Sequence, residues 1–184
     1  MATEMGAREA RSAAMNTGGR SLLLPGALLG IGLGGFFDGI VLHQVLQWHH
    51  MVSNEVAVTT VAGLEANTLA DGLFHAAAWV VTLAGVALLF VRSRRGVSVA
   101  GWALAGWMLL GWGVFNLVEG VVDHHILQLH HVRPGANELA YDIGFLVFGA
   151  LLVAVGWAMA TRSEARGNAG SVEVTRDEEG RRAA

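Results

Sequence analysis

Four long apolar stretches dominate the middle of the chain and constrain its fold more than any other feature. The 140 residues from 21 to 160 carry only twelve of the 27 charged side chains, and 53% of the chain is hydrophobic. Charged residues make up 15% of the chain, against about a quarter in soluble domains. Because each stretch approaches the roughly 20 apolar residues that cross a bilayer, the sequence predicts an all-α integral membrane four-helix bundle. It excludes an ordinary soluble enzyme, a nucleic-acid-binding domain and a disordered chain.

The helices are predicted to span about residues 22–47, 69–91, 97–122 and 139–160. We expect the first and third helices to continue beyond the hydrocarbon, to about Met51 and Val132. Asn67 and Thr68 are good N-cap residues for the second helix, and Asn137 has the same position before the fourth. The domains are therefore an N-terminal tail (1–20), the four-helix transmembrane domain (21–160) and a disordered C-terminal tail (161–184).

Arginines in the short flanks predict the orientation of the spans. They are concentrated before the first span, between the second and third, and after the fourth, whereas the other side has only Arg133. Because positive flanks stay in the cytoplasm, we expect both termini and the middle loop to be cytoplasmic, and the loops at about 52–66 and 132–138 to face outward. The first apolar run follows a mixed-charge tail and has no A-x-A-like site after it, so no cleavable signal peptide is expected.

An internal repeat relates the two halves of the chain. Residues 38–51 align without a gap with residues 119–132, at an offset of 81, and the acid, glycine, histidine, glutamine and final His pair coincide. One helix later, the segment 67–71 resembles the segment 137–142. The sequence therefore predicts two parallel copies of a two-helix unit, related by a pseudo-two-fold axis along the membrane normal, with the first and third helices facing each other. The predicted repeats are residues 22–92 and 97–160.

All eight histidines fall in one predicted layer at the outer end of the bundle, and the cytoplasmic halves of the spans contain none. On a helical wheel His43 and His50 share one stripe, and Asp38 and His49 share another. Asp142 belongs to the same layer. The best candidate ligands are His43, His75 and His124 with Asp38, Asp71, Glu119 and Asp123. The outer candidates, about one to two turns further out, are His49, His50, His130 and His131.

The residue types in this layer indicate metal chemistry. Imidazole and carboxylate ligands without any cysteine suit Fe, Zn, Mn or Cu. An ionised carboxylate in an apolar layer costs roughly 2.5–3.5 kcal/mol on an insertion scale, and a bound cation would offset that cost. We therefore predict a transition-metal site for Fe, Cu or Zn, holding either one off-axis ion or two inequivalent ions. The alternatives are haem held by two histidines, and a proton path or polar network without metal.

Glycines recur within the first and third spans. The first group has the spacing of a nucleotide-binding motif but lies inside an apolar span with no strand before it. Small residues let membrane helices approach closely, so both groups predict close helix packing. The glycines are Gly30, Gly32, Gly34 and Gly35 in the first span, and Gly101, Gly106, Gly111 and Gly113 in the third.

Three long motifs carry a resemblance to a known family. The chain contains FFDGIVLHQVLQWHHM (36–51), ADGLFH (70–75) and NLVEGVVDHH (116–125). These segments resemble a family of bacterial predicted membrane proteins that is catalogued as a domain of unknown function. The resemblance covers about residues 22–160. It implies a four-span protein of the bacterial cytoplasmic (inner) membrane and supplies no activity.

Three functional classes are compatible with such a site. Redox or oxygen chemistry would make the protein a small membrane metal-dependent oxidoreductase, and enzyme activity then depends on a substrate pocket between the helices. A metal-handling or assembly factor would deliver or sense Cu, Fe or Zn for an outward-facing partner such as a respiratory complex. The third class is a haem-binding or structural membrane subunit. The expected partners are the lipid bilayer and a second copy of the chain or another membrane protein, and nucleic acid is not expected.

Overall fold

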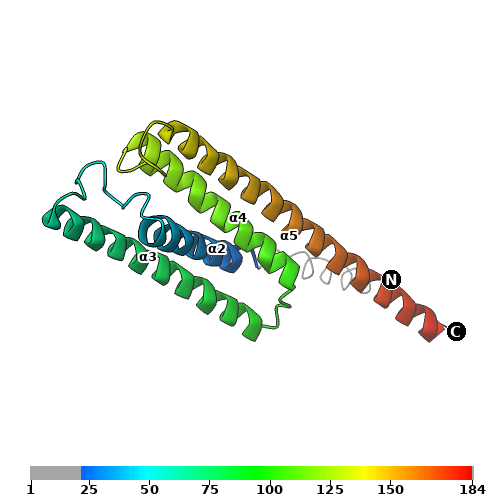
Figure 1. The fold of residues 1–184 in the computed structure, drawn as a ribbon. Helices are drawn as coiled ribbons and strands as arrows, with labels where there is room; N and C mark the ends of the chain where they lie inside the picture. Colours follow the sequence, from blue (N-terminus) through cyan, green and yellow to red (C-terminus); the bar gives the residue numbers. More distant parts are fainter. Residues whose placement is uncertain (1–21, 184) are drawn as a thin grey trace.

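The computed structural model describes residues 22–183, with side chains described for residues 22–166 and 181. This part of the chain is helical and contains no strand, and four of its helical segments are long and apolar enough to cross a membrane, as predicted. Two segments end in a π-helix. The elements are α2 (Leu23–Phe37), the π-helix η1 (Asp38–Val45), α3 (Val61–Arg94), α4 (Gly101–Glu119), the π-helix η2 (Gly120–Ile126) and α5 (Glu138–Ala183) (Figure 1).

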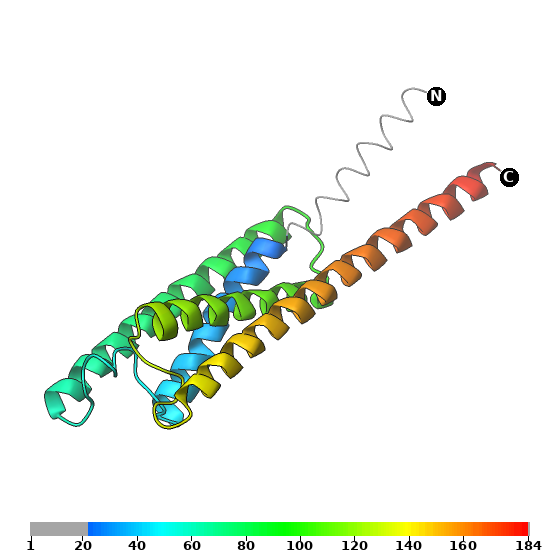
Figure 2. The ribbon, with the colours of Figure 1, turned by 90° about the horizontal axis from the view of Figure 1, so that it is seen from above.

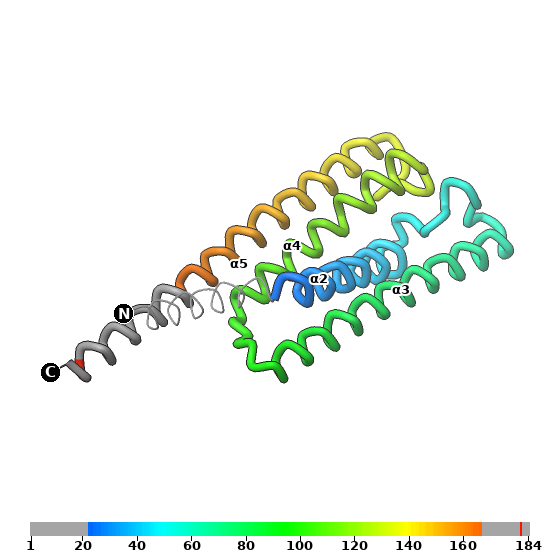
Figure 3. Tube along the Cα trace, turned by 180° about the vertical axis from the view of Figure 1, so that it is seen from behind, coloured from blue at the N-terminus to red at the C-terminus, as the bar shows by residue number. Residues whose placement is uncertain are grey.

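Helices α2 and α4 form the central pair of the bundle. Helix α3 packs on α2, and α5 packs on α4 (Figure 1 and Figure 2). Seen from behind, the loops 46–60 and 127–137 lie at one end of the bundle, and the connection 95–100 lies at the other (Figure 3). We call the first of these the histidine end. The apolar core cluster, at the opposite end, consists of Leu22, Ala103, Trp107 and Ala160.

Glycines allow the helix backbones to touch. A Cβ atom on Gly30 would collide with the main chain of α4, and a Cβ atom on Gly111 would collide with the main chain of α2. Gly106 and Gly113 meet the main chain of α5 in the same way. These contacts confirm the predicted close packing at the four positions. Gly101 differs, because no atom lies within 4 Å of the place its Cβ would take.

The prediction that the first and third helices continue to Met51 and Val132 is wrong. Both helices end where their π-helical segments end, six residues earlier. Gln47 and Gln128 then adopt left-handed backbone conformations, with φ of 49° and 52°, and the chain turns back. Such angles are uncommon for residues other than glycine, and nothing in either local sequence predicts them. The stripes drawn on a continuous helical wheel therefore do not apply to the histidines beyond these turns.

Helix α3 begins at Val61, eight residues before the predicted span. Its N-cap is Thr60, whose Oγ1 accepts a hydrogen bond from the Gly63 N–H at 3.0 Å. Asn67, the predicted cap, is buried inside the helix, where its side-chain amide donates to the main-chain oxygen of Val56 at 2.8 Å. The asparagine thus fastens the preceding loop to α3 rather than starting the helix.

Helix α5 begins directly after Asn137 and continues to Ala183. The sequence predicts a disordered tail from residue 161, whereas the structure continues the helix. The stretch Glu164-Ala165-Arg166 favours this continuation, because all three residue types are good helix formers. The predicted N-terminal tail lies outside the described residues. Large apolar side chains are exposed along α3 and α5, among them Leu69, Trp79 and Phe148, as expected of helices that contact lipid.

Candidate metal centre

The histidine end buries an unusual number of polar side chains. They come from both π-helices, the end of α4, the two outer helices and the two loops. Such side chains are rarely buried unless they are paired or bind a metal ion. The histidines and carboxylates that are at most 5% exposed are Asp38, His43, His49, Asp71, Glu119, His124, His130 and Asp142.

Each π-helical segment brings one acid and one histidine together. His43 Nε2 lies 3.0 Å from Asp38 Oδ2, and His124 Nε2 lies 3.0 Å from Glu119 Oε1. The members of each pair are five residues apart, which in an α-helix separates side chains by about 140° around the axis. The i→i+5 hydrogen bonding of a π-helix stacks residues five apart instead. The main-chain bonds that close η1 and η2 have this spacing.

Asp71, on α3, contacts Nδ1 of His43. Its Oδ1 lies 2.9 Å from His43 Nδ1 and accepts a hydrogen bond from the Met51 N–H at 2.9 Å. Its Oδ2 lies 2.6 Å from His50 Nδ1. The aspartate, predicted as a metal ligand, therefore orients one ring of the cluster and anchors the loop that follows η1.

Asp142, on α5, has the same position in the other half. Its Oδ1 lies 3.3 Å from His124 Nδ1 and accepts a hydrogen bond from the Val132 N–H at 2.9 Å. Its Oδ2 lies 2.6 Å from His131 Nδ1. The aspartate thus ties the second loop to α5.

His49 and His130 reach the cluster from the two loops. His49 Nδ1 lies 2.8 Å from the main-chain oxygen of Val132, and His130 Nδ1 lies 3.0 Å from that of Met51. Because a carbonyl oxygen only accepts, both Nδ1 atoms donate, and Nε2 of a neutral ring carries the lone pair. Burial and the charges of neighbouring His130 and His43 lower the pKa of His49 to about 3. This ring is therefore neutral, and it stacks on the ring of His130, with the ring centroids 4.5 Å apart.

Glu119 faces two imidazole nitrogens at once. Its Oε1 lies 3.0 Å from Nε2 of both His124 and His130. Since Nδ1 of His130 already donates to a carbonyl, the contact of its Nε2 with a carboxylate requires a shared proton or a cation. Burial acts to lower the pKa of His130, but the hydrogen bond to Glu119 and the charge of that carboxylate outweigh it and raise this pKa.

Several buried atoms of the cluster have no hydrogen-bond partner. A buried polar atom without a partner is costly, and lone pairs that converge in this way are what a metal ion requires. Two triplets have ligand atoms within 4.8 Å of one another, His43–His49–His130 and Glu119–His124–His130. The atoms without any such contact are Asp38 Oδ1, His49 Nε2 and Glu119 Oε2. His43 Nε2 and His124 Nδ1 lie near a carboxylate oxygen, at 3.0 and 3.3 Å, but without hydrogen-bond geometry.

Comparison with known proteins identifies the family of the chain. The family model described as predicted membrane protein (DUF2243) matches residues 25–163. The chain belongs to this family. The resemblance found in the sequence motifs is thereby confirmed, and the family description names no activity. No curated protein and no solved structure shows a significant match to the chain.

The segment that matches the DUF2243 family contains every residue predicted for the site, but not all of them join the cluster. His75 lies next to the rings of Phe36 and Phe74, and its buried Nε2 has no hydrogen-bond partner. Asp123 is half-buried and lines a small cavity beside Glu119. Neither belongs to the two ligand triplets.

Three further groups of the site were not among the predicted ligands: Asp142 and the main-chain oxygens of Met51 and Val132. Asp142 aligns with Asp71 only after a one-residue insertion, Tyr141, in the segment 137–142. That alignment is the signal that identifies it. The two carbonyls depend on the path of the loops, for which the sequence carries no signal.

Proposed function

We propose that this membrane protein binds one or two transition-metal ions at the histidine end and that the centre is redox-active. The observation that carries the proposal is a shared arrangement of four imidazoles. Each has its Nδ1 against an outward acceptor, an aspartate or a main-chain carbonyl. This leaves Nε2 for the interior of the cluster, where a bound cation would take the place of the present contacts with Asp38 and Glu119. Metal-binding histidines are characteristically held in this way. The proposed ligands are His43, His49, His124 and His130, with Asp38 and Glu119.

Two buried carboxylates of the cluster support a cation at this position. Asp38 and Glu119 are both buried, and each has one carboxylate oxygen without a hydrogen-bond partner. Removing a carboxylate from water costs several kcal/mol unless a positive charge compensates. A divalent ion between the two carboxylates would supply that charge, with the imidazole of His49 as a neutral ligand.

The ligand types limit the metal. Imidazole and carboxylate without thiolate suit Fe, Cu or Zn, and only Fe and Cu would give the centre redox activity. The rings are in mutual contact, with centroids 4.4 Å apart for His43 and His49 and 4.8 Å apart for His124 and His130. This spacing leaves no room for a porphyrin between them, which favours non-haem ions over haem.

A resident centre is favoured over metal delivery. The outer histidines His50 and His131 would have to be free to collect metal at the mouth. Instead each is held at 2.6 Å by an aspartate, Asp71 or Asp142. A role as an assembly factor for a respiratory complex therefore has less support than a fixed cofactor site.

Chelator competition tests the proposal. We expect His49→Ala to lose most of the metal that the detergent-purified wild-type protein retains, because it removes a neutral, pre-oriented ligand. His49 lies in a loop, so no helix is interrupted. The matched control is His125→Ala, since His125 is exposed and outside the ligand triplets. Equal metal retention in the two variants and the wild type contradicts the proposed ligand set, and rapid loss from all three favours delivery.

We also propose that the fold arose from two copies of one helix pair. Contacts at an offset of 81 residues support this, because His49–Val132 and His130–Met51 are equivalent under that shift. The two π-helical segments and the left-handed Gln47 and Gln128 coincide as well. Duplication of a two-helix unit gives two parallel copies.

The orientation that we propose places the histidine end on the outer side of a bacterial inner membrane and both termini in the cytoplasm. Arginines support it. Arg92, Arg94 and Arg95 lie at the α3–α4 connection, whereas the two loops of the histidine end contain Arg133 alone. Positive flanks remain cytoplasmic.

A further inference from the structure

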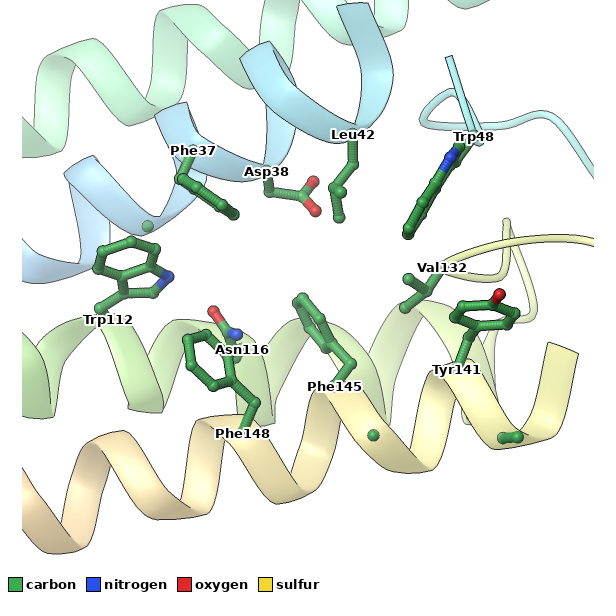
Figure 4. A pocket seen from close by; sticks show the side chains of 13 residues that line it. Phe37, Asp38, Leu42, Trp48, Trp112, Asn116, Val132, Tyr141, Phe145 and Phe148 are labelled. Atoms are coloured by element: carbon green, nitrogen blue, oxygen red, sulfur yellow. The ribbon is translucent and has the colours of Figure 1, made fainter. Parts of the chain in front are cut away.

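A cavity of about 280 Å³ lies beside the proposed metal centre, between the α2–η1 segment and helices α4 and α5 (Figure 4). Six of the thirteen residues that line it are aromatic. Figure 4 shows two polar side chains, Asp38 and Asn116, projecting toward the space among these rings. A volume near the lower end of the range for ligand pockets fits one ring rather than a larger molecule. The aromatic lining residues are Phe37, Trp48, Trp112, Tyr141, Phe145 and Phe148.

The polar atoms of the cavity define what the ligand must offer. Asn116 is 2% exposed and its Oδ1 has no hydrogen-bond partner, and the same holds for Oδ1 of Asp38, which is 3% exposed. Both atoms accept hydrogen bonds. None of the described residues that line the cavity is basic, and the Asp38 carboxylate repels anions. The ligand must therefore donate hydrogen bonds and carry no negative charge, which excludes phosphate and carboxylate head groups.

The surroundings of the cavity indicate that the ligand arrives from the bilayer. Phe37 and Phe148 line it, are each 46% exposed and lie within membrane-spanning segments. The loop side is covered by Trp48 and Tyr141, with Arg133 over both rings at 5.2 and 5.4 Å and its guanidinium donating to the Tyr141 hydroxyl at 2.9 Å. A ligand that enters past the two phenylalanines is lipid-soluble.

We propose that this cavity binds the head group of a lipid-soluble quinol. A hydroxylated aromatic ring fits aromatic walls, one of its hydroxyls donates to Oδ1 of Asn116, and its apolar tail leaves toward lipid. The other oxygen of Asp38 lies 3.0 Å from His43 Nε2, so the bound ring lies next to the cluster. The quinol's role as a substrate rests on the proposed metal centre, whereas its binding does not require the metal.

A second cavity, on the other side of the α2–α4 pair, shows why only the cavity beside Asp38 is proposed to bind the quinol. It lies against Glu119 as the first lies against Asp38. There, Phe115 and Asp123 occupy the positions that Gly34 and Leu42 occupy in the first cavity, at the offset of 81 residues. Only two of the described residues that line that cavity, Phe74 and Phe115, are aromatic, and Asp123 adds a second carboxylate. It is therefore less suited to an aromatic ligand, although its volume is the same.

Binding of a decyl-substituted hydroquinone to the detergent-purified full-length protein, kept without oxygen, tests the proposal. Quenching of tryptophan fluorescence reports occupancy, because Trp48 and Trp112 line the cavity. Asn116→Leu is expected to weaken binding by about tenfold or more, since it removes a buried acceptor. Gly144→Leu is expected to weaken it by filling the cavity, because no atom lies within 4 Å of a Cβ on Gly144. Gly72→Leu, at an equally open glycine on α3, is the matched control and keeps wild-type binding.

Metal content measured on the same samples separates this proposal from the metal centre. Quinol binding that the Asn116 and Gly144 variants lose, while Gly72→Leu keeps it, supports the cavity whether or not the protein holds metal. Failure of the wild-type protein to bind the hydroquinone overturns the proposal, even if the protein retains its metal. Wild-type affinity in both cavity variants overturns it as well.

Discussion

Replacing Asp71 with alanine is expected to destabilise the protein and to release the proposed metal ion. The carboxylate accepts from the Met51 N–H and meets Nδ1 of both His43 and His50. Removing one partner of a buried charged pair typically costs about 3–5 kcal/mol, and loss of a residue that orients a metal-bound histidine lowers metal affinity about 10–100-fold. Thermal unfolding in detergent and chelator competition measure the two effects.

Two further variants show whether these effects come from the cluster. Glu65→Ala removes an exposed carboxylate from the same helix and is expected to behave like the wild type. Asp71→Asn keeps the size of the side chain but offers only one acceptor oxygen, so its defect is expected to fall between the two alanine variants. If Asp71→Ala unfolds at the temperature of Glu65→Ala and keeps its metal, Asp71 does not position His43.

Leucine at Gly30 or Gly111 is expected to prevent α2 and α4 from packing. At both positions the obstructing atoms belong to the main chain of the opposite helix, so no side-chain rotation relieves the collision. Overpacking in a well-packed interior commonly costs about 1–3 kcal/mol, and a backbone obstruction places these variants at or above the upper value. We expect a large loss of monodisperse protein on size-exclusion chromatography and a lower unfolding temperature in what remains.

A leucine at an unobstructed glycine of α3 is the control for these glycine variants. Gly72→Leu makes the same change on α3 where nothing obstructs the side chain, and it is expected to leave stability unchanged or raise it slightly, because leucine favours helix. Variants at Gly30 and Gly111 that unfold like Gly72→Leu would show that the central helices do not approach at these glycines.

Much of the fold follows from the sequence because a bilayer demands it. Long apolar runs with few charges must form helices to satisfy their main-chain groups. Glycines of the first and third runs, Gly101 excepted, mark where helices touch. The start of α3 was missed because Asn67 has the chemistry of a cap but is buried in the helix, fastening a loop. The true cap, Thr60, lies outside the apolar run that marked the predicted span.

The residues of the site were more predictable than their geometry. The repeat identified the acid and histidine of each half, for example Asp38 and His43, since burial of ionisable groups in a membrane usually reflects function. Their contact depends on a π-helix, and the inward return of His49 depends on a left-handed Gln47. Neither conformation has a sequence signature of the kind that glycine or proline provides. The residue types therefore indicated a metal site, whereas the side chains that face one another in it could be identified only from the structure.

An X-ray absorption spectrum of the detergent-purified protein tests the metal centre most directly. We expect an absorption edge of Fe, Cu or Zn, with nitrogen and oxygen ligands at about 2.0–2.2 Å and the outer-shell scattering that several imidazoles produce. The same spectrum of His49→Ala is expected to show a weaker imidazole contribution, or no metal. An edge with sulfur or porphyrin ligation, or a wild-type protein that shows no metal edge after incubation with each of the three ions, would contradict the account.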